Sequence, residues 1–310
     1  MKLLKFVLPG FLAILAFISF STSITSCSKK TVTVHDTTTI IVRDTVTIQD
    51  TVVINDTLGN LSDGLVAYYN FNNGNLNDSS GNGNNITFNN ATLTADRFGN
   101  ANNAYLFDGS TSYMEIKNST SLNPTNNITI YAIVKVYGFN EASCHGNQIL
   151  SKGYPYNTNG FYNLAFFAAN NGIGGCSPTV DTTQELFDGS YGDDNPQGSN
   201  AGVAGNSTAD SIWVQKYQWY TLVYTYDGAT AKFYVNGALA KKIDYPSGIP
   251  FTPNSNDLFI GKHENPAFPY FFNGVIDEVR IYNKAITDQQ VGYLSILKDK
   301  YLKFKGKLIY

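Results

Sequence analysis

Two cysteines and a neighbouring histidine carry the most reactive side chains of this 310-residue sequence. Cys144 and Cys176 form an even pair, and in an exported protein such a pair predicts a disulfide. The bridge would close a loop of about 33 residues and contribute about 3–4 kcal/mol on the chain-entropy model. A thiol nucleophile beside His145 is the alternative, but neighbours on a strand point to opposite faces. A zinc site would lack its fourth ligand.

Carboxylates are the next candidates, because retaining glycoside hydrolysis needs two of them about 5–5.5 Å apart. Only five glutamates occur: Glu115, Glu141, Glu185, Glu264 and Glu278. Asp277 and Glu278 are adjacent on a predicted strand and should face opposite sides. Asp193 and Asp194 have no glutamate close in sequence. No phosphate loop, Ser-His-Asp set or zinc motif occurs, so an enzyme would need a site assembled from distant residues.

Three polar segments carry aromatic rings beside amides and carboxylates, at 153–161, 177–213 and 263–270. A ring can stack on the C–H face of a sugar while polar groups take its hydroxyls. The candidate ligand-binding residues are Tyr154, Tyr156, Tyr191, His263, Glu264, Asn265 and Tyr270, with Phe268 in the last segment. The alternative for each is an aromatic residue that pins its loop to the fold.

The elements that position these residues are predicted to be strands. Aromatic residues make up 14% of the chain and the formal charge is −3, which gives no general attraction to nucleic acid. Segments 128–136 and 219–226 are apolar strands, and Asn236-Gly237 between two such runs predicts a hairpin. Segment 287–293 is predicted to start a short helix, with Thr287 as its N-cap.

The N-terminal residues 1–26 have the layout of a signal peptide: a basic start, an apolar run and a short polar end. Ile24-Thr25-Ser26-Cys27 resembles a bacterial lipobox. The resemblance implies cleavage before Cys27 and its lipidation, which anchors the protein in the cell envelope, at the outer membrane. Exported lipoproteins of the Bacteroidetes type often carry acids after this cysteine. Here Ser28-Lys29-Lys30 follows, which leaves the face of the membrane open.

Residues 27–60 form a low-complexity segment rich in Thr, Val and Ile, with Asp-Thr repeated four times. β-Branched residues disfavour a helix. Fully extended, residues 31–57 of this segment would span roughly 85–90 Å at about 3.3 Å per residue. It predicts a stalk, either solitary or paired with a second chain.

From residue 64 the chain resembles a known family. The matching runs are GLVAYYNFNNGNLNDSSGNGNN, AYLFDGSTSYMEI, WYTLVYTYDGATAKFYVNG and FNGVIDEVRIYNKAITDQQV. In this order they resemble the concanavalin A-like, laminin-G-like domains of secreted bacterial proteins. The resemblance implies an all-β, antiparallel jelly-roll β-sandwich over residues 61–293, followed by a basic tail at 294–310.

The same resemblance implies a structural calcium ion (Ca2+). In similar jelly rolls, residues matching Asp78, a backbone oxygen near Gly109 and Asp277 meet around one ion, and Asn82 is a further candidate ligand. Calcium prefers several hard oxygens, which carboxylates and loop carbonyls supply. Without the resemblance, these residues would be assigned to Asx turns and strand-end hydrogen bonds.

Together these features predict an envelope-anchored, non-catalytic recognition module whose partner is a carbohydrate or an extracellular protein. Two alternatives remain: a glycoside hydrolase with an unrecognised site, and a structural adhesin or assembly subunit. Proteins with this fold perform all three functions, so the geometry of the site has to distinguish between them. The oligomeric state stays open.

Overall fold

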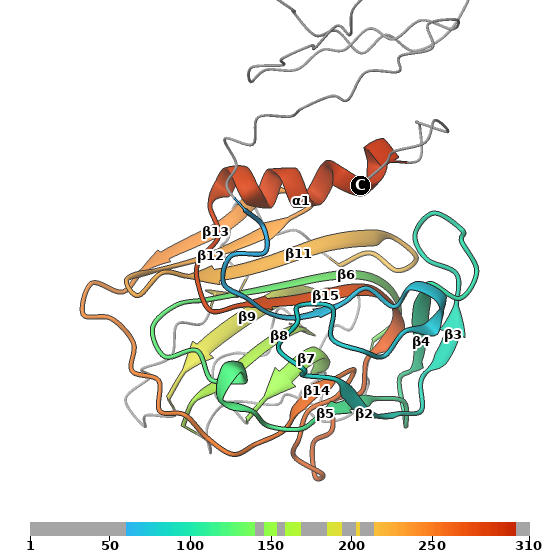
Figure 1. Ribbon diagram of the computed structural model, residues 1–310, viewed down its shortest axis with the longest axis horizontal. Coiled ribbons are helices and arrows are strands. Elements are labelled where there is room, and N and C mark those ends of the chain that lie inside the picture. Colours follow the sequence, from blue (N-terminus) through green and yellow to red (C-terminus); the bar gives the residue numbers. More distant parts are fainter. Residues whose placement is uncertain are drawn as a thin grey trace, which may run out of the picture. The chain divides into compact units, whose positions relative to one another are not determined.

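The computed structural model describes residues 60–139, 146–153, 159–168, 185–193, 203–204 and 214–301. From Leu61 onward these residues form one unit in which two antiparallel sheets pack face to face (Figure 1). The predicted all-β antiparallel sandwich is confirmed. The predictions for Cys27, the signal peptide, the stalk, Cys144, Cys176, Tyr154 and Tyr156 lie outside the described residues.

Sheet A contains eight of the described strands, and β1 pairs with β15 beside the main path. Its order is β13 (Ala238–Asp244), β12 (Thr230–Val235), β11 (Trp219–Tyr226), β6 (Ile128–Gly138), β15 (Asn273–Tyr282), β4 (Ala104–Asp108) and β3 (Thr92–Thr94), with β1 spanning Leu65–Tyr69.

Sheet B contains seven of the described strands. Its order is β10 (Val203–Ala204), β9 (Glu185–Gly192), β8 (Phe161–Ala168), β7 (Asn147–Lys152), β14 (Leu258–Ile260), β5 (Met114–Ile116) and β2 (Ile86–Asn89). Two short 3-10 helices, η1 (Asn72–Gly74) and η2 (Thr120–Leu122), interrupt the loops.

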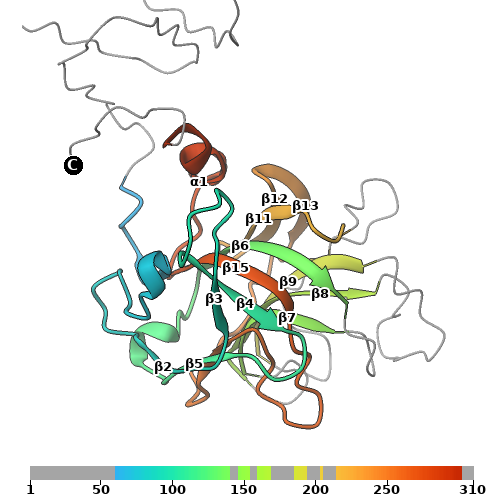
Figure 2. The same ribbon diagram turned by 90° about the vertical axis from the view of Figure 1, so that its right-hand side faces the viewer.

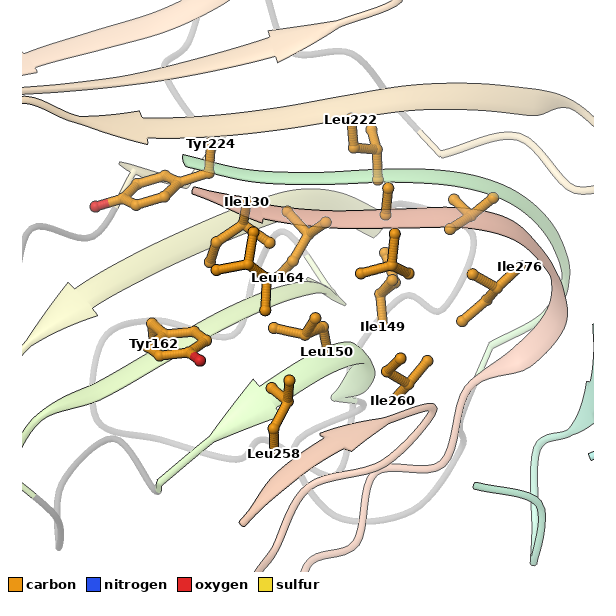
Figure 3. Packing of buried hydrophobic residues seen from close by; sticks show 14 of the residues in the cluster. Ile130, Ile149, Leu150, Tyr162, Leu164, Leu222, Tyr224, Leu258, Ile260 and Ile276 are labelled. Carbon is orange, nitrogen blue, oxygen red and sulfur yellow. The ribbon is translucent and has the colours of Figure 1, made fainter. Parts of the chain in front are cut away.

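Alternation along the strands builds the core. In β6, Ile130 and Val134 point towards sheet B, and in β8, Tyr162 and Leu164 point back at them. Figure 3 shows Ile130, Tyr162 and Leu164 among the side chains packed between the two layers. Full burial of one such side chain, for example Leu222, stabilises the fold by about 1.5–3 kcal/mol.

The hairpin between β12 and β13 follows the sequence prediction. Asn236 has φ 53° and Gly237 has φ 83°. Positive φ at both positions is the type I′ geometry, which matches the twist of the strands. The two-residue connection places Val235 opposite Ala238, so this part of the edge of sheet A was predictable from one dipeptide.

Among the described residues, one α-helix, α1 (Asp288–Tyr301), packs on the outer face of sheet A against β6, β11 and β12 (Figures 1 and 2). Its start is a capping box, in which Gln290 N donates to Thr287 Oγ1 (3.2 Å) and Thr287 N donates to Gln290 Oε1 (2.9 Å). The predicted N-cap is therefore confirmed.

The helix continues past the domain boundary expected at residue 293. Leu294 is buried with Val291 against Tyr131 and Ile133 of β6, and this packing carries the helix beyond its predicted end. Within the described residues, no helix has the length and apolar character needed to cross a membrane.

Candidate functional site

The loop from His263 to Tyr270 joins β14 to β15 and is the candidate site. Its base is closed by backbone hydrogen bonds. Gly261 N donates to Ile149 O and Phe272 N donates to Gly261 O, both at 2.9 Å. Above them, His263 N donates to Pro269 O at 2.7 Å. The loop therefore rises from sheet B as a closed, hairpin-like projection.

Asn265 shapes the tip of this loop. Its Oδ1 accepts a hydrogen bond from Ala267 N (2.9 Å), and its carbonyl accepts one from Phe268 N (3.1 Å). This Asx turn holds residues 266–268 outward. Phe268 is 38% exposed, and its ring stacks on Tyr270 with 6.1 Å between centroids. At the tip of the loop, the ring of Phe268 is therefore exposed to solvent and is packed against the ring of Tyr270.

Tyr270 is held in a strained position. Its φ is 45°, which is uncommon for a residue other than glycine. Its ring lies against Gly146, where a Cβ atom would be 2.9 Å from Tyr270 Cγ, and its carbonyl accepts a hydrogen bond from Gln148 N (2.8 Å). Strained residues of this kind persist where their surroundings fix them, and they cluster at ligand sites.

Glu264, on the same loop as the two rings, is a fixed hydrogen-bond acceptor. Asn256 Nδ2 donates to both of its carboxylate oxygens, at 2.6 and 2.7 Å. The side chain is half-buried rather than fully enclosed. A carboxylate oriented in this way retains lone pairs that can accept hydrogen bonds from a ligand.

His263 positions the loop. Its side chain is 1% exposed, and its Nδ1 accepts a hydrogen bond from Asn265 N at 3.3 Å. Burial, together with the charge of Lys262, lowers the pKa of His263 to about 4. The imidazole is therefore neutral at physiological pH. The expectation that His263 touches a ligand is corrected, since the ring is enclosed.

Tyr191 is a core residue, which corrects the expectation that it binds a ligand. Its side chain is fully buried, and its ring stacks on Phe251 at 4.6 Å with 7° between planes. Its hydroxyl donates to Pro124 O at 3.0 Å. The residue belongs to β9 and points towards sheet A, so its burial follows from strand alternation.

Asp78, the first expected calcium ligand, has both oxygens occupied. Its Oδ1 accepts hydrogen bonds from Tyr68 N and Ser80 N, both at 2.9 Å. Its Oδ2 accepts from Ser80 Oγ (2.8 Å) and Asn84 N (3.0 Å). A carboxylate has about four lone-pair sites. The four donors therefore leave none for an ion.

The other expected ligands have separate partners. Asp277 is buried, and its Oδ2 lies 3.8 Å from Arg97 Nε, so a guanidinium supplies the positive charge there. Gly109 N donates to Phe272 O, and Asn82 Nδ2 donates to Leu65 O. These bonds use nitrogens, so the misfit to calcium rests on the carboxylates of Asp78 and Asp277. Among the described residues, no three His, Cys, Asp or Glu side chains gather as metal ligands. In this arrangement the residues do not fit a calcium ion.

Chelation tests this conclusion directly. We expect EGTA to leave the Tm of the protein within about 1 °C, because an ion that does not bind the native state cannot stabilise it. The measurement is a thermal melt with EGTA, with added calcium and with added magnesium. A fall of several degrees that calcium alone reverses would show that the ion implied by the resemblance is bound after all.

A shallow polar hollow of about 220 Å³ lies next to η2. Ser121, Asn123, Thr125, Asn127 and Asn283 are among its lining residues. Pockets for drug-sized ligands are larger, about 300–1,000 Å³, and mostly apolar. The hollow lacks an aromatic ring, so the 263–270 loop remains the better candidate.

The sequence pointed to the 263–270 loop as a candidate but not to two of its neighbours in the structure. Asn256 lies in a Ser/Asn/Asp run that reads as an ordinary turn, and nothing in the sequence indicates that it binds Glu264. Lys262 was also missed. Its Nζ lies 4.0 Å from the ring centroid of Tyr113, a contact between residues about 150 positions apart.

The described fold is a two-sheet antiparallel sandwich with an aromatic loop at one connection, which is the architecture of a concanavalin A-like domain. The chain belongs to the Concanavalin A-like lectin/glucanases superfamily (Laminin_G_3), which matches residues 108–292 and so more than half of the sequence. No curated protein matches the chain significantly.

Solved structures share the fold. The binding domain of Paraclostridial Mosquitocidal Protein 1 is 14% identical with a TM-score of 0.56, over 77% of this chain and 53% of that one. The Botulinum Neurotoxin serotype G binding domain is 14% identical with a TM-score of 0.52, over 76% and 51%. The chain thus spans about half the length of these structures, and likeness at this identity shows the fold alone.

Proposed function

We propose that this protein is a non-catalytic recognition module that binds carbohydrate through the 263–270 loop. The carrying observation is the exposed ring of Phe268, stacked on a Tyr270 whose backbone is fixed. Binding to an aromatic ring that is already ordered costs little conformational entropy. Its natural counterpart is the C–H face of a sugar ring.

The polar half of the site complements this platform. Glu264, oriented by Asn256, accepts hydrogen bonds from sugar hydroxyls at the side of the rings. A carboxylate that is already hydrogen-bonded needs no rearrangement to do so. The combination of one aromatic face and one fixed acceptor suits a neutral sugar ring.

The neighbouring acids Asp277 and Glu278 support the non-catalytic assignment. Both are 1% exposed. Glu278 Oε1 lies 2.6 Å from Arg280 Nε, and Asp277 faces Arg97. Two buried carboxylates that each bind an arginine serve the fold, since a general acid must reach the glycosidic oxygen.

The cellular setting is part of the proposal. Lipidation of Cys27 and the 27–60 stalk would hold the domain outside the cytoplasm at the outer membrane, where glycans and extracellular proteins are the available partners. Solved structures of this fold include one from botulinum neurotoxin type C, whose cell entry depends on interaction with two ganglioside molecules. They support a binding role by analogy of fold.

Substitution of Phe268 tests the site. We expect Phe268→Ala to weaken glycan binding about tenfold, because one exposed stacking ring contributes about 1 kcal/mol or more to an interface. The readout is a glycan array followed by titration of the full-length chain in detergent. The Tm should change little, since the ring is partly exposed.

Phe88→Ala is the matched control, because Phe88 is similarly exposed at 42% but lies on β2. Equal loss in both variants, or no loss in Phe268→Ala, would remove the loop from the site. Release of reducing ends during binding would point to an enzyme. Absence of binding to any glycan would favour an extracellular protein partner.

A further inference from the structure

A second aromatic surface lies on the outer face of sheet A, at the end of β6. Val134 and Val136 of this strand point into the core. The alternate residues Lys135 and Tyr137 therefore point outward. Trp219, the first residue of β11, pairs with Lys135 across the ladder. α1 packs on this face over Tyr131 and Ile133, further back along β6.

Tyr217 completes this surface in an unusual backbone conformation. It lies in the turn before β11 with φ 66°, and its N donates to Val136 O at 2.7 Å. Its side chain is 66% exposed, and its ring meets that of Tyr137 at 5.6 Å between centroids. The backbone strain is thus not offset by burial of the ring. Backbone strain that holds an aromatic ring in solvent is typical of a residue that contacts a ligand.

Two lysines give the surface its charge. Lys135 Nζ lies 5.6 Å from the ring centroid of Tyr137 and 5.9 Å from that of Trp219. Lys216 Nζ lies 4.7 Å from the ring centroid of Phe139. Neither lysine takes part in the ion pairs found among the described residues. The ring of Phe139 packs edge-on against Phe166 of the core, so Phe139 is not part of the outer face. The basic aromatic patch consists of Lys135, Tyr137, Tyr217 and Trp219, with Lys216 at its rim beside Tyr217.

A second cluster of similar residues shows why the charge matters. On sheet B, Phe88 stacks on Tyr113 at 4.7 Å, and Lys262 lies over Tyr113. There, however, Glu115 and Asp257 lie close by, bound to Lys117. That cluster is neutralised by its own carboxylates. The basic aromatic patch shows no carboxylate partner within the described residues.

We propose that the basic aromatic patch is a second binding site, and that it takes an acidic glycan whose pyranose rings carry carboxylate or sulfate groups. The rings of Tyr217 and Trp219 stack on the sugar, while Lys135 and Lys216 bind its anionic groups. Exposed amides at Gln215 and Gln218 flank the turn and suit the hydroxyls. This site goes beyond the proposed function, because it lies on the outer face of sheet A, whereas the 263–270 loop follows β14 of sheet B.

Titration calorimetry of the full-length chain in detergent tests the proposal. The probes are an oligogalacturonate, a heparin-derived oligosaccharide and the carboxyl-reduced oligogalacturonate. We expect binding to one or both acidic probes, weak binding to the reduced one, and loss of affinity as NaCl rises from about 0.1 M to about 1 M. Comparing the oligogalacturonate with the heparin-derived oligosaccharide distinguishes recognition of carboxylate groups from recognition of sulfate groups.

Tyr217→Gly is the informative variant, because glycine adopts positive φ without strain. It should lower affinity for the acidic probe about tenfold while the Tm stays equal or rises. Lys135→Gln with Lys216→Gln should lower affinity and flatten the salt dependence. Phe268→Ala and Phe88→Ala should bind the acidic probe like the wild type.

Three results would overturn the proposal: no binding of either acidic oligosaccharide, binding that Tyr217→Gly leaves unchanged, or binding that Phe268→Ala abolishes. The last would assign the acidic glycan to the 263–270 loop and leave the proposed function intact. Conversely, acidic binding that survives in Phe268→Ala, with no other glycan bound, would support the patch and reject the loop.

Discussion

Gly261→Ala is expected to lower the free energy of unfolding by about 2–5 kcal/mol. Gly261 follows β14 with φ 85°, a region that costs other residues about 1–2 kcal/mol. A Cβ atom there would lie 2.3 Å from Cδ1 of Phe107. Phe107 is fully buried and meets Phe272 edge-on, so it has little room to move. Overpacking of this kind adds about 1–3 kcal/mol.

The measurement is urea unfolding of Gly261→Ala beside Gly83→Ala. Gly83 also has positive φ, at 77°, but its Cβ would meet nothing within 4 Å. Gly83→Ala should therefore cost about 1–2 kcal/mol, the backbone share alone. Equal values for both variants would mean that Phe107 moves aside. Gly261→Ala should also weaken glycan binding, because the bonds of Gly261 close the base of the loop.

The sequence predicted the sandwich because the relevant signals are local. The apolar, β-branched and aromatic runs at 128–136 and 219–226 indicate buried strands without knowledge of the partner strand. Asn236-Gly237 dictates its own turn, and Thr287 with Gln290 forms a capping box within one helical turn. Each of these interactions joins residues fewer than five positions apart.

The site was only partly predictable, because its contacts join distant segments. Arg97 and Asp277 are separated by 180 residues, and no local pattern pairs them. Tyr191 was taken for a loop residue because its surroundings are rich in Gly, Asp and Asn, yet β9 carries it into the core. Asp78 has the composition of a calcium ligand, but Ser80 and Asn84 of its own loop supply three of its four donors and Tyr68 N of β1 supplies the fourth.

The backbone conformation of Tyr217 could not be predicted from the sequence either. Nothing in Gln-Lys-Tyr-Gln predicts a left-handed tyrosine. The conformation arises where Tyr217 N meets Val136 O, a partner on β6. When a long-range contact fixes the backbone conformation of a functional residue, that conformation can differ from the residue's local preference. Such a residue can be recognised in a structure but not in a sequence.

Stability should rise between pH 8 and 10 because of one buried lysine. Lys152 is 0% exposed, and its Nζ donates to Asn123 Oδ1 (3.0 Å) and Asn254 Oδ1 (2.6 Å). Burial lowers the pKa of Lys152 to about 8, from an ordinary value of 10.5. Both bonded groups are neutral amides, so the native state holds this charge without a bound carboxylate.

The sign of the effect follows from proton binding. Below pH 8 both states are protonated, and the native state bears the whole cost of the buried charge. Between pH 8 and 10.5 the native amine loses its proton while the unfolded one keeps it, so the free energy of unfolding increases. At about 1.4 kcal/mol per pKa unit, the gain by pH 10 is about 2 kcal/mol.

Buried tyrosines limit this gain. Burial raises the pKa of Tyr162 and Tyr191 well above 10.0, so their contribution to stability is lost as pH rises past 10 and they ionise in the unfolded chain. Stability should therefore peak near pH 10 and then fall. The measurement is urea unfolding from pH 7 to 11, compared between wild type and Lys152→Met.

Lys152→Met should flatten the rise between pH 8 and 10 and lose little at pH 7, because the amide oxygens keep other donors. Asn123 Oδ1 still accepts from Asn254 N at 3.2 Å, and Asn254 Oδ1 from Asn256 N at 3.0 Å. Lys242→Met, at an exposed lysine paired with Asp244, should leave the rise intact. A rise that persists in Lys152→Met would assign it to other lysines, with Lys262 the first candidate because burial lowers its pKa as well.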